Sequence, residues 1–279
     1  MINLEDFKNT LLTTIKLHDI DHFLIHTDAL RAPFRSSSKT QKDILQDYVT
    51  DIDNLTAGIN YSLPCFNYDF IKTGIYSVID SECQVGAINE YVRRSNYSYR
   101  TLTPVFSYTY KFGIDFKESL IPCDPFSKTS FFDYLKRKKT ILLHYGSEIV
   151  HSTLIHYIER IGKSLLYRYD KVFKGVVFTS ENEKIGAELI YHVRPKNIHL
   201  KYANEKLRID LLNEGIMIEW AQKGQRVSFC DYERLVEFWL FKFNSDPYYF
   251  LDDETVFIID TQIQKLGRKF LLSDFEYEK

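Results

Sequence analysis

The spacing of apolar residues along the chain alternates between the period of a helix and that of a strand. Residues 4–17 have helical spacing, and the next apolar run, HFLIH at residues 22–26, is short and bounded by polar residues. The segment SSSKTQKDILQDYVTDID then offers serines as helix caps, and INYSLPCF returns to strand character. The N-terminal region therefore predicts a helix, a strand, a second helix and a second strand.

The alternation continues through the middle of the chain. Ser81 and Gln84 stand in capping-box spacing before an expected helix, and residues 105–111 alternate like a half-buried strand. We expect a helix at residues 131–139 and a buried strand at residues 140–146, which ends at a glycine. Alternating strands and helices are typical of a layered α/β/α fold with a mixed sheet.

The C-terminal part mixes strands and helices without a linker or a repeat. GVVFTS and KIGAELIYHVRP predict strands, and MIEWAQKGQRVSFCD predicts a hairpin around Lys223 and Gly224. Helices are expected at residues 206–213 and 232–243. We expect a core at residues 1–175 that holds the site, with a C-terminal α+β elaboration at residues 176–279 packed on it, or one continuous domain.

Composition excludes several classes of protein. The chain has 279 residues, 44% hydrophobic and 27% charged, with a formal charge of −2 and no basic stripe, so nucleic acid is a poor partner. It has no basic start followed by an apolar block and no apolar run of roughly 18 residues, so we expect a cytoplasmic protein that binds no membrane. The 20 tyrosines and 21 phenylalanines suit cores and interfaces alike, which leaves a homo-oligomer open.

The four cysteines give no sign of a metal site or a disulfide framework. Cys65, Cys83, Cys123 and Cys230 lie far apart, so we expect no bound metal. A Cys65 nucleophile has no local signature. The chain also lacks GxGxxG, GxxxxGK[ST], HExxH and GxSxG, which removes the usual support for nicotinamide, P-loop, zincin and serine-hydrolase chemistry.

The segment HSTLIHYIE carries the strongest chemical signal. If Ser152 caps a helix, His156 falls near its first turn, where the helix dipole disfavours the imidazolium form. Glu159 lies three residues further along the same side and could orient the imidazole. His156 is then a candidate general base. A solvated surface histidine is the alternative, and the spacing alone favours it.

Three other polar segments carry weaker signals. RTLTPVFS could hold a phosphate or a carbonyl oxygen, LPCFNYDF places an amide and aromatic residues after a strand, and HTDALRAPF offers capping residues and an arginine. Ordinary turns and strand ends are built from the same residue types. None of these segments identifies a function by itself.

The order of these segments resembles the antibiotic N-acetyltransferase family, which includes the aminoglycoside 3-N-acetyltransferases. The resemblance runs through IHTD, LPCFNY, VGAINEYVRR, RTLTPVFS, FSKTSFFDYL, ILLHYG and STLIHYIE, over residues 20–175. It implies a transferase that uses a coenzyme A thioester, acetyl-CoA or a short hydroxyacyl-CoA, as co-substrate, without a metal.

Within this family, the chain looks closer to the branch that acylates nucleotide-linked amino sugars. HYIERIGKSLLYRYDKVFKG carries that likeness, and Thr103 stands where the drug-modifying branch usually has a histidine. Positive charges in or beside the motifs favour anionic ligands such as coenzyme A and a nucleotide sugar. These residues are Arg93, Arg94, Arg100, Lys163, Arg168 and Lys171.

The resemblance implies a role for each candidate residue. His156, oriented by Glu159, would take the proton of the attacking amine, and Thr103 and Ser107 could stabilise the oxyanion. The expected cofactor-binding residues are His26, Thr27, Asp28, Arg31, Arg100 and Thr101. The expected substrate-binding residues are Asn67, Tyr68, Asn89 and Glu90. Alternatively, the amine loses its proton to solvent or through a sugar hydroxyl, and the enzyme supplies mainly orientation.

The sequence thus predicts an N-acyltransferase. It would move an acetyl or short hydroxyacyl group from coenzyme A to the amino group of a dTDP-type amino deoxysugar for surface-polysaccharide synthesis. Two alternatives stay open. One is an aminoglycoside 3-N-acetyltransferase, and the other is a non-catalytic module that binds coenzyme A or a nucleotide sugar.

Overall fold

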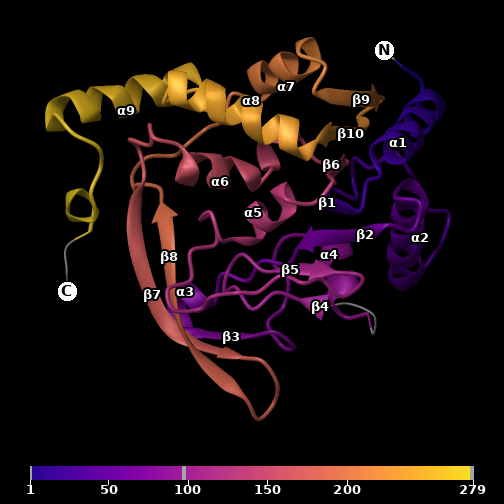
Figure 1. Cartoon of the computed structure of the whole chain (residues 1–279), viewed down its shortest axis with the longest axis horizontal. Helices are drawn as coiled ribbons and strands as arrows, with labels where there is room; N and C mark the ends of the chain where they lie inside the picture. The colour runs from indigo at the N-terminus through magenta and orange to yellow at the C-terminus, as the bar shows by residue number, and fades with distance from the viewer. Residues whose placement is uncertain (1, 96–98, 277–279) are drawn as a thin grey trace.

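The computed structural model of the chain describes residues 2–95 and 99–276 (Figure 1). The helices are α1 (Leu4–His18), α2 (Gln41–Leu55), α3 (Phe70–Thr73), α4 (Ala87–Arg93), α5 (Phe131–Lys136), α6 (Leu154–Ile161), α7 (Asn204–Asn213), α8 (Tyr232–Ser245) and α9 (Asp253–Leu266), with short 3-10 turns at Ile149–His151 and Leu272–Asp274. The strands are β1 (His22–Thr27), β2 (Asn60–Pro64), β3 (Ile75–Ser77), β4 (Tyr99–Arg100), β5 (Tyr108–Tyr110), β6 (Thr140–Tyr145), β7 (Tyr169–Phe178), β8 (Lys184–Val193), β9 (Met217–Gln222) and β10 (Gln225–Asp231).

The larger sheet is mixed. Among the described residues its strand order is β4-β5-β2-β1-β6-β10-β9. β1 lies between β2 and β6 and is parallel to both, whereas β5 and β10 pair antiparallel with β2 and β6. A smaller sheet has the order β3-β7-β8, and its long β7–β8 hairpin runs from the left side toward the bottom of Figure 1. The predicted α/β fold with a mixed sheet is confirmed.

Helices cover both faces of the larger sheet because its central strands are apolar on both sides. Along β1, Leu24 points into one core, while Phe23 and Ile25 point into the other. One core contains buried residues of α1, α2 and α4, and the other contains those of α5, α6 and α8. The result is the expected α/β/α layering.

Local capping differs from the prediction at two helices. α2 is capped by the side chain of Thr40, which accepts from the backbone nitrogen of Asp43, and not by one of the preceding serines. α4 begins at Ala87 after Gly86, and the hydroxyl of Ser81 instead accepts from the backbone nitrogen of Ser77. The capping box expected at Ser81 and Gln84 is therefore wrong, because α4 starts later than its apolar pattern indicates.

The C-terminal part contributes directly to the larger sheet. The predicted hairpin is confirmed: β9 and β10 meet at Lys223 and Gly224, which have φ of 51° and 81°. β10 then pairs with β6, and the expected boundary after residue 175 falls inside β7. The division of the chain into two parts stays a prediction.

None of the helices in the described ranges is both long and apolar enough to cross a lipid bilayer. All four cysteines are free thiols.

Candidate active site

A cavity of about 680 Å³ opens at the carboxyl ends of β1 and β6. Because β1, β2 and β6 run parallel, their ends and the loops that follow meet at one edge of the sheet. The lining residues are His26, Thr27, Asp28, Ala29, Leu30, Pro64, Phe66, Tyr68, Val85, Gly86, Ala87, Ile88, Asn89, Phe106, Ser147, Val150, His151, Ser152, Thr153, His156, Tyr191 and Tyr202. Sequence segments far apart in the chain thus build one pocket.

His156 faces this cavity. It is the third residue of α6, and its side chain is 20% exposed, whereas the neighbouring apolar residues of the helix are buried. Its ring centroid lies 5.3 Å from that of Phe126 and 6.4 Å from that of Tyr191. The alternative of a surface histidine is therefore wrong, because aromatic side chains enclose the imidazole and leave it open toward the cavity.

Glu159 lies fully buried behind His156. Its Oε2 is 3.2 Å from Nδ1 of His156, at an angle that leaves both atoms without a well-formed hydrogen bond. The same oxygen is 2.8 Å from Nε of Arg168, and Oε1 accepts a hydrogen bond of 2.7 Å from the hydroxyl of Tyr167. These contacts hold the carboxylate close to the imidazole, and the role of Glu159 in orienting a base stays a prediction.

The electrostatics of this pair favour a neutral imidazole beside an ionised carboxylate. Burial lowers the pKa of His156 below its ordinary value of 6.5, the charge of Arg168 lowers it further, and Glu159 acts in the opposite direction. Burial would raise the pKa of Glu159, but Arg168 and His156 hold it well below its usual range. A general base that works near neutral pH needs this combination.

The same group of side chains has the spacing of a possible metal site. His156, Glu159 and His192 place ligand atoms within 4.8 Å of one another. However, the guanidinium of Arg168 already contacts the oxygen that a metal ion would need. A second cation there would be repelled, so the donor set fits an internal charge network better than a metal ion.

Five of the other predicted ligand-binding residues also line the cavity. His26, Thr27 and Asp28 come from the end of β1, Tyr68 follows β2, and Asn89 belongs to α4. The hydroxyl of Thr27 donates to Oδ1 of Asn89 at 2.8 Å, which links the end of β1 to α4. The structure therefore brings these residues together with His156, while their individual roles stay predictions.

The RTLTPVFS loop lies outside the cavity lining, apart from Phe106. The hydroxyl of Thr103 donates to the carboxylate of Glu118, and the hydroxyl of Ser107 donates to the backbone oxygen of Cys65. Arg100 is buried and donates to the backbone oxygens of Cys65, Val78 and Ser81, and the hydroxyl of Thr101 accepts from the backbone nitrogen of Tyr108. The expected oxyanion and cofactor contacts of these residues do not fit their positions, because internal partners already use their polar atoms.

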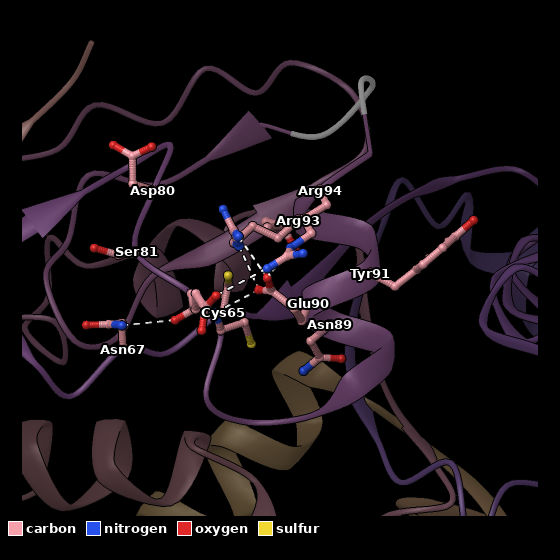
Figure 2. Close-up of polar contacts among 12 residues, drawn as sticks. Cys65, Asn67, Asp80, Ser81, Asn89, Glu90, Tyr91, Arg93 and Arg94 are labelled. Atoms are coloured by element: carbon pink, nitrogen blue, oxygen red, sulfur yellow. Dashed lines mark hydrogen bonds and ion pairs between the residues drawn. The ribbon is translucent and has the colours of Figure 1, made fainter. Parts of the chain in front are cut away.

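Figure 2 shows a second internal cluster, which is centred on Glu90. Glu90 lies between Arg93 and Arg94, at 2.7 and 2.6 Å, and also accepts from the backbone nitrogen of Cys83. Partial burial would raise the pKa of Glu90, but these donors hold it at about 2. Asn89, one residue earlier in α4, points away from the cluster in Figure 2. Glu90 is therefore a structural residue here, and a contact to substrate does not fit it.

Two further predicted residues are also held by neighbours. Asn67 donates to the backbone oxygen of Glu82 and accepts from the backbone nitrogen of Asp69. Arg31 contacts Glu148 at 3.0 Å and does not line the cavity. Both positions support the loops around the cavity.

Most of the positive charges expected to favour an anionic ligand are paired within the chain. Arg93 and Arg94 pair with Glu90, Arg168 pairs with Glu159, and Lys171 pairs with Glu276. Lys163 lines a second cavity of about 910 Å³, on the side of Glu159 and Arg168 near the C-terminal tail. These cations balance carboxylates of the chain itself, so they give little evidence for an anionic ligand.

Three residues of the site were missed by the sequence prediction. Tyr191 and His192 come from β8, and Tyr202 lies in the segment between β8 and α7. His192 places Nε2 3.7 Å from Oε2 of Glu159, while Tyr191 and Tyr202 line the cavity. Their segment reads as an ordinary alternating strand and loop, and no local motif marks them.

The fold resembles that of several solved structures, among them aminoglycoside acetyltransferases. No protein-family model matches the chain, and no curated protein matches it in sequence. Aminoglycoside acetyltransferase AAC(3)-IVa, as apoenzyme, is 14% identical with a TM-score of 0.60, over 88% of this chain and 91% of that chain. AAC-IIIb in binary complex with CoASH is 13% identical with a TM-score of 0.60, over 84% and 94%. YokD from Bacillus subtilis is 12% identical with a TM-score of 0.62, over 86% and 94%. At these identities the likeness establishes the fold.

Proposed function

We propose that this chain is an acyl-CoA-dependent N-acyltransferase whose acceptor is the amino group of a nucleotide-linked amino sugar. The observation that carries the proposal is the pair of His156 and Glu159, which faces a cavity at the carboxyl ends of parallel strands. This pair occurs in a fold shared with acetyltransferases over most of both chains.

The chain's own residues fit the proton transfer that this reaction requires. The amine nitrogen bonds to the acyl carbon, the bond from that carbon to sulfur breaks, and the sulfur leaves as a thiolate. Nε2 of His156, the ring nitrogen that does not contact Glu159, takes the proton released by the amine and returns it to the thiolate. The carboxylate of Glu159, 3.2 Å from Nδ1, stabilises the imidazolium formed in between. Phe106, Phe126 and Tyr191 exclude water from around the imidazole.

The cavity also fits the acyl end of a coenzyme A thioester. Its walls combine aromatic rings, such as Phe66 and Phe106, with hydroxyl groups, such as those of Ser152 and Thr153. An acetyl or short hydroxyacyl group on a pantetheine arm has the same mixed character. The donor supplies the activated carbonyl carbon, and the chain supplies the base.

The charge of the cavity weighs against a polycationic acceptor. Among its described lining residues Asp28 is the one carboxylate, and none is a lysine or an arginine. A polycation such as an aminoglycoside would meet a single counter-charge there. An amino sugar with one amine needs no more than this single carboxylate. Tyr68 is 41% exposed and offers a ring on which a nucleotide base can stack. The exposed Arg194 lies close enough for its charge to act on His156. The product would then serve surface-polysaccharide synthesis.

A second candidate acceptor is an aminoglycoside. A variant of AAC(3)-IVa in complex with a gentamicin has a TM-score of 0.64 to this chain at 12% identity, over 94% of this chain and 93% of that chain. The shared fold thus includes a protein that holds such a ligand, and this favours the candidate about as strongly as the charge argument opposes it.

One assay tests the donor class and the acceptor together. Purified protein is given acetyl-CoA with a panel of nucleotide-linked 3- and 4-amino deoxysugars, or with a panel of aminoglycosides, and thiol release is followed. Release with the nucleotide sugars alone is the expected result. Release with aminoglycosides alone contradicts the proposal that the acceptor is a nucleotide-linked amino sugar. Binding of coenzyme A without turnover on either panel, also with longer acyl donors, indicates a binding module instead.

A further inference from the structure

Thr103 and Ser107 do not line the cavity, so the acyl carbonyl lacks the hydrogen-bond donors that the sequence predicted for it. Negative charge develops on the carbonyl oxygen as the amine nitrogen bonds to the carbon, and enzymes stabilise it with donors fixed in advance. A replacement must line the cavity that contains His156 and must be held rigidly by the rest of the chain.

Tyr202 meets both conditions. It lines the same cavity as His156. Its hydroxyl oxygen accepts a hydrogen bond of 2.9 Å from Nη2 of Arg168, whose side chain is 2% exposed. Because the oxygen accepts from Arg168, the phenolic proton stays available to donate to another acceptor.

Arg168 also strengthens that donor. A guanidinium that donates to a phenol withdraws electron density from its oxygen and makes the O–H a better donor, and this effect is larger where water is excluded. Burial raises the pKa of Tyr202, so the phenol keeps its proton near neutral pH, where the imidazole of His156 is also neutral. A phenol in this state donates a hydrogen bond and does not compete with His156 as a base.

We infer that Tyr202, held by Arg168, donates a hydrogen bond to the carbonyl oxygen of the acyl donor and stabilises the charge that develops there. The inference rests on the proposed function. The carboxylate of Glu159 then serves both halves of the reaction, because Oε2 contacts Nδ1 of His156 and Nε of Arg168. The hydrogen bond strengthens while the C–N bond forms and weakens again when the C–S bond breaks and the carbonyl is restored.

The first test is kinetic. Tyr202→Phe removes the donor and should lower kcat by about 10²- to 10³-fold, with a smaller change in KM, because the interaction is strongest in the transition state. Tyr202→Gln can accept from Arg168 and donate into the cavity, and should recover part of the loss. Tyr249→Phe is the matched control, since it removes a hydroxyl that donates to Asp210 at 2.9 Å outside the cavity. Unchanged kcat in Tyr202→Phe, or an equal loss in Tyr191→Phe alone, would overturn the assignment.

The second test is spectroscopic and separates donation from a merely structural role. In the His156→Ala background, isotope-edited infrared spectra of bound acetyl-CoA labelled with ¹³C at the carbonyl report the hydrogen bond directly. The band should lie at lower wavenumber than in His156→Ala/Tyr202→Phe. The same band in both proteins overturns the inference, whatever the kinetics show.

The two tests also separate this inference from the proposed function. Wild-type protein that binds acetyl-CoA but acylates no amine contradicts the function, and the carbonyl band still tests Tyr202. Protein that does not bind acetyl-CoA contradicts both. Normal turnover, together with a carbonyl band that Tyr202→Phe does not shift, contradicts this inference alone.

Discussion

Nε of Arg168 lies 2.8 Å from Oε2 of Glu159, and both side chains are almost completely buried. This pair connects α6 with the residue just before β7, and it fixes the carboxylate behind His156. A buried ion pair of this kind is costly to break, because the remaining charge has no water around it. Stability and chemistry at this site therefore depend on the same contact.

The first prediction concerns that pair. Glu159→Gln should destabilise the protein by about 3 to 5 kcal/mol, because the charge of Arg168 stays buried without its partner. Glu159→Gln/Arg168→Met removes both charges and should recover a large part of the loss. Urea unfolding of the wild-type protein and the two variants measures the free energies. A double variant that is less stable than Glu159→Gln would show that Arg168 stabilises the fold by other contacts.

The second prediction concerns the base. His156→Ala should lower kcat by about 10²- to 10⁴-fold while the protein stays folded, because the amine loses its proton acceptor. His18→Ala, a change in the last turn of α1, is the control and should leave kcat unchanged. A loss of less than about tenfold in His156→Ala would favour deprotonation of the amine without an enzyme base.

The pH dependence gives a third prediction. The neutral imidazole is the active form, so the rate is full above the pKa of His156 and falls as pH drops through it. Because burial and Arg168 lower that pKa, the acid limb of kcat should lie below pH 6.5. Glu159 raises the pKa, so Glu159→Gln should move the limb to still lower pH. An acid limb that persists unchanged in His156→Ala would belong to another group.

The elements that the sequence predicted well are those whose signal is local. The apolar runs of β1 and β6 reflect burial on both faces, and the Lys223–Gly224 turn needs positive φ at both positions. His156 and Glu159 are close in sequence and share one side of a helix, so their contact could be predicted from spacing.

The rest of the site depends on contacts that spacing does not show. Arg100 donates to the backbone of Cys65 across 35 residues, and Arg168 donates to Tyr202 across 34. The sequence alone does not distinguish such structural arginines from arginines that bind a ligand. Nothing local indicates that the chain's own carbonyls, carboxylates and phenols satisfy them first. For this reason, the sequence placed Arg100 and Thr103 at the site although neither lines the cavity, and it missed Tyr202, which does.

A fourth prediction concerns metals. Treatment with EDTA should leave kcat unchanged, and the wild-type protein should bind no stoichiometric zinc at the site, because Arg168 opposes a cation beside Glu159. Arg168→Met removes that charge and leaves His156, Glu159 and His192 within 4.8 Å of one another, so zinc affinity should rise. Elemental analysis and zinc titration measure both. One equivalent of zinc in the wild-type protein, with activity lost on chelation, would contradict the charge network.

The last prediction concerns Gly146, which directly follows β6. Its φ is +84°, and an added Cβ would lie 2.1 Å from the backbone oxygen of Asp28 and 2.7 Å from the backbone nitrogen of Ala32. Gly58 has a similar φ of +75° but open space around it. Gly58→Ala should therefore lose about 1 to 2 kcal/mol, the strain of the left-handed backbone alone.

Gly146→Ala should lose more than about 4 kcal/mol, because the backbone that follows β1 must also move away. That movement would displace Thr27 and Asp28 from the cavity wall, so the activity of whatever protein stays folded should fall as well. Urea unfolding and thiol release measure the two effects. Equal losses of stability in the two alanine variants would show that the backbone of residues 28–32 moves away from residue 146 at little cost in free energy.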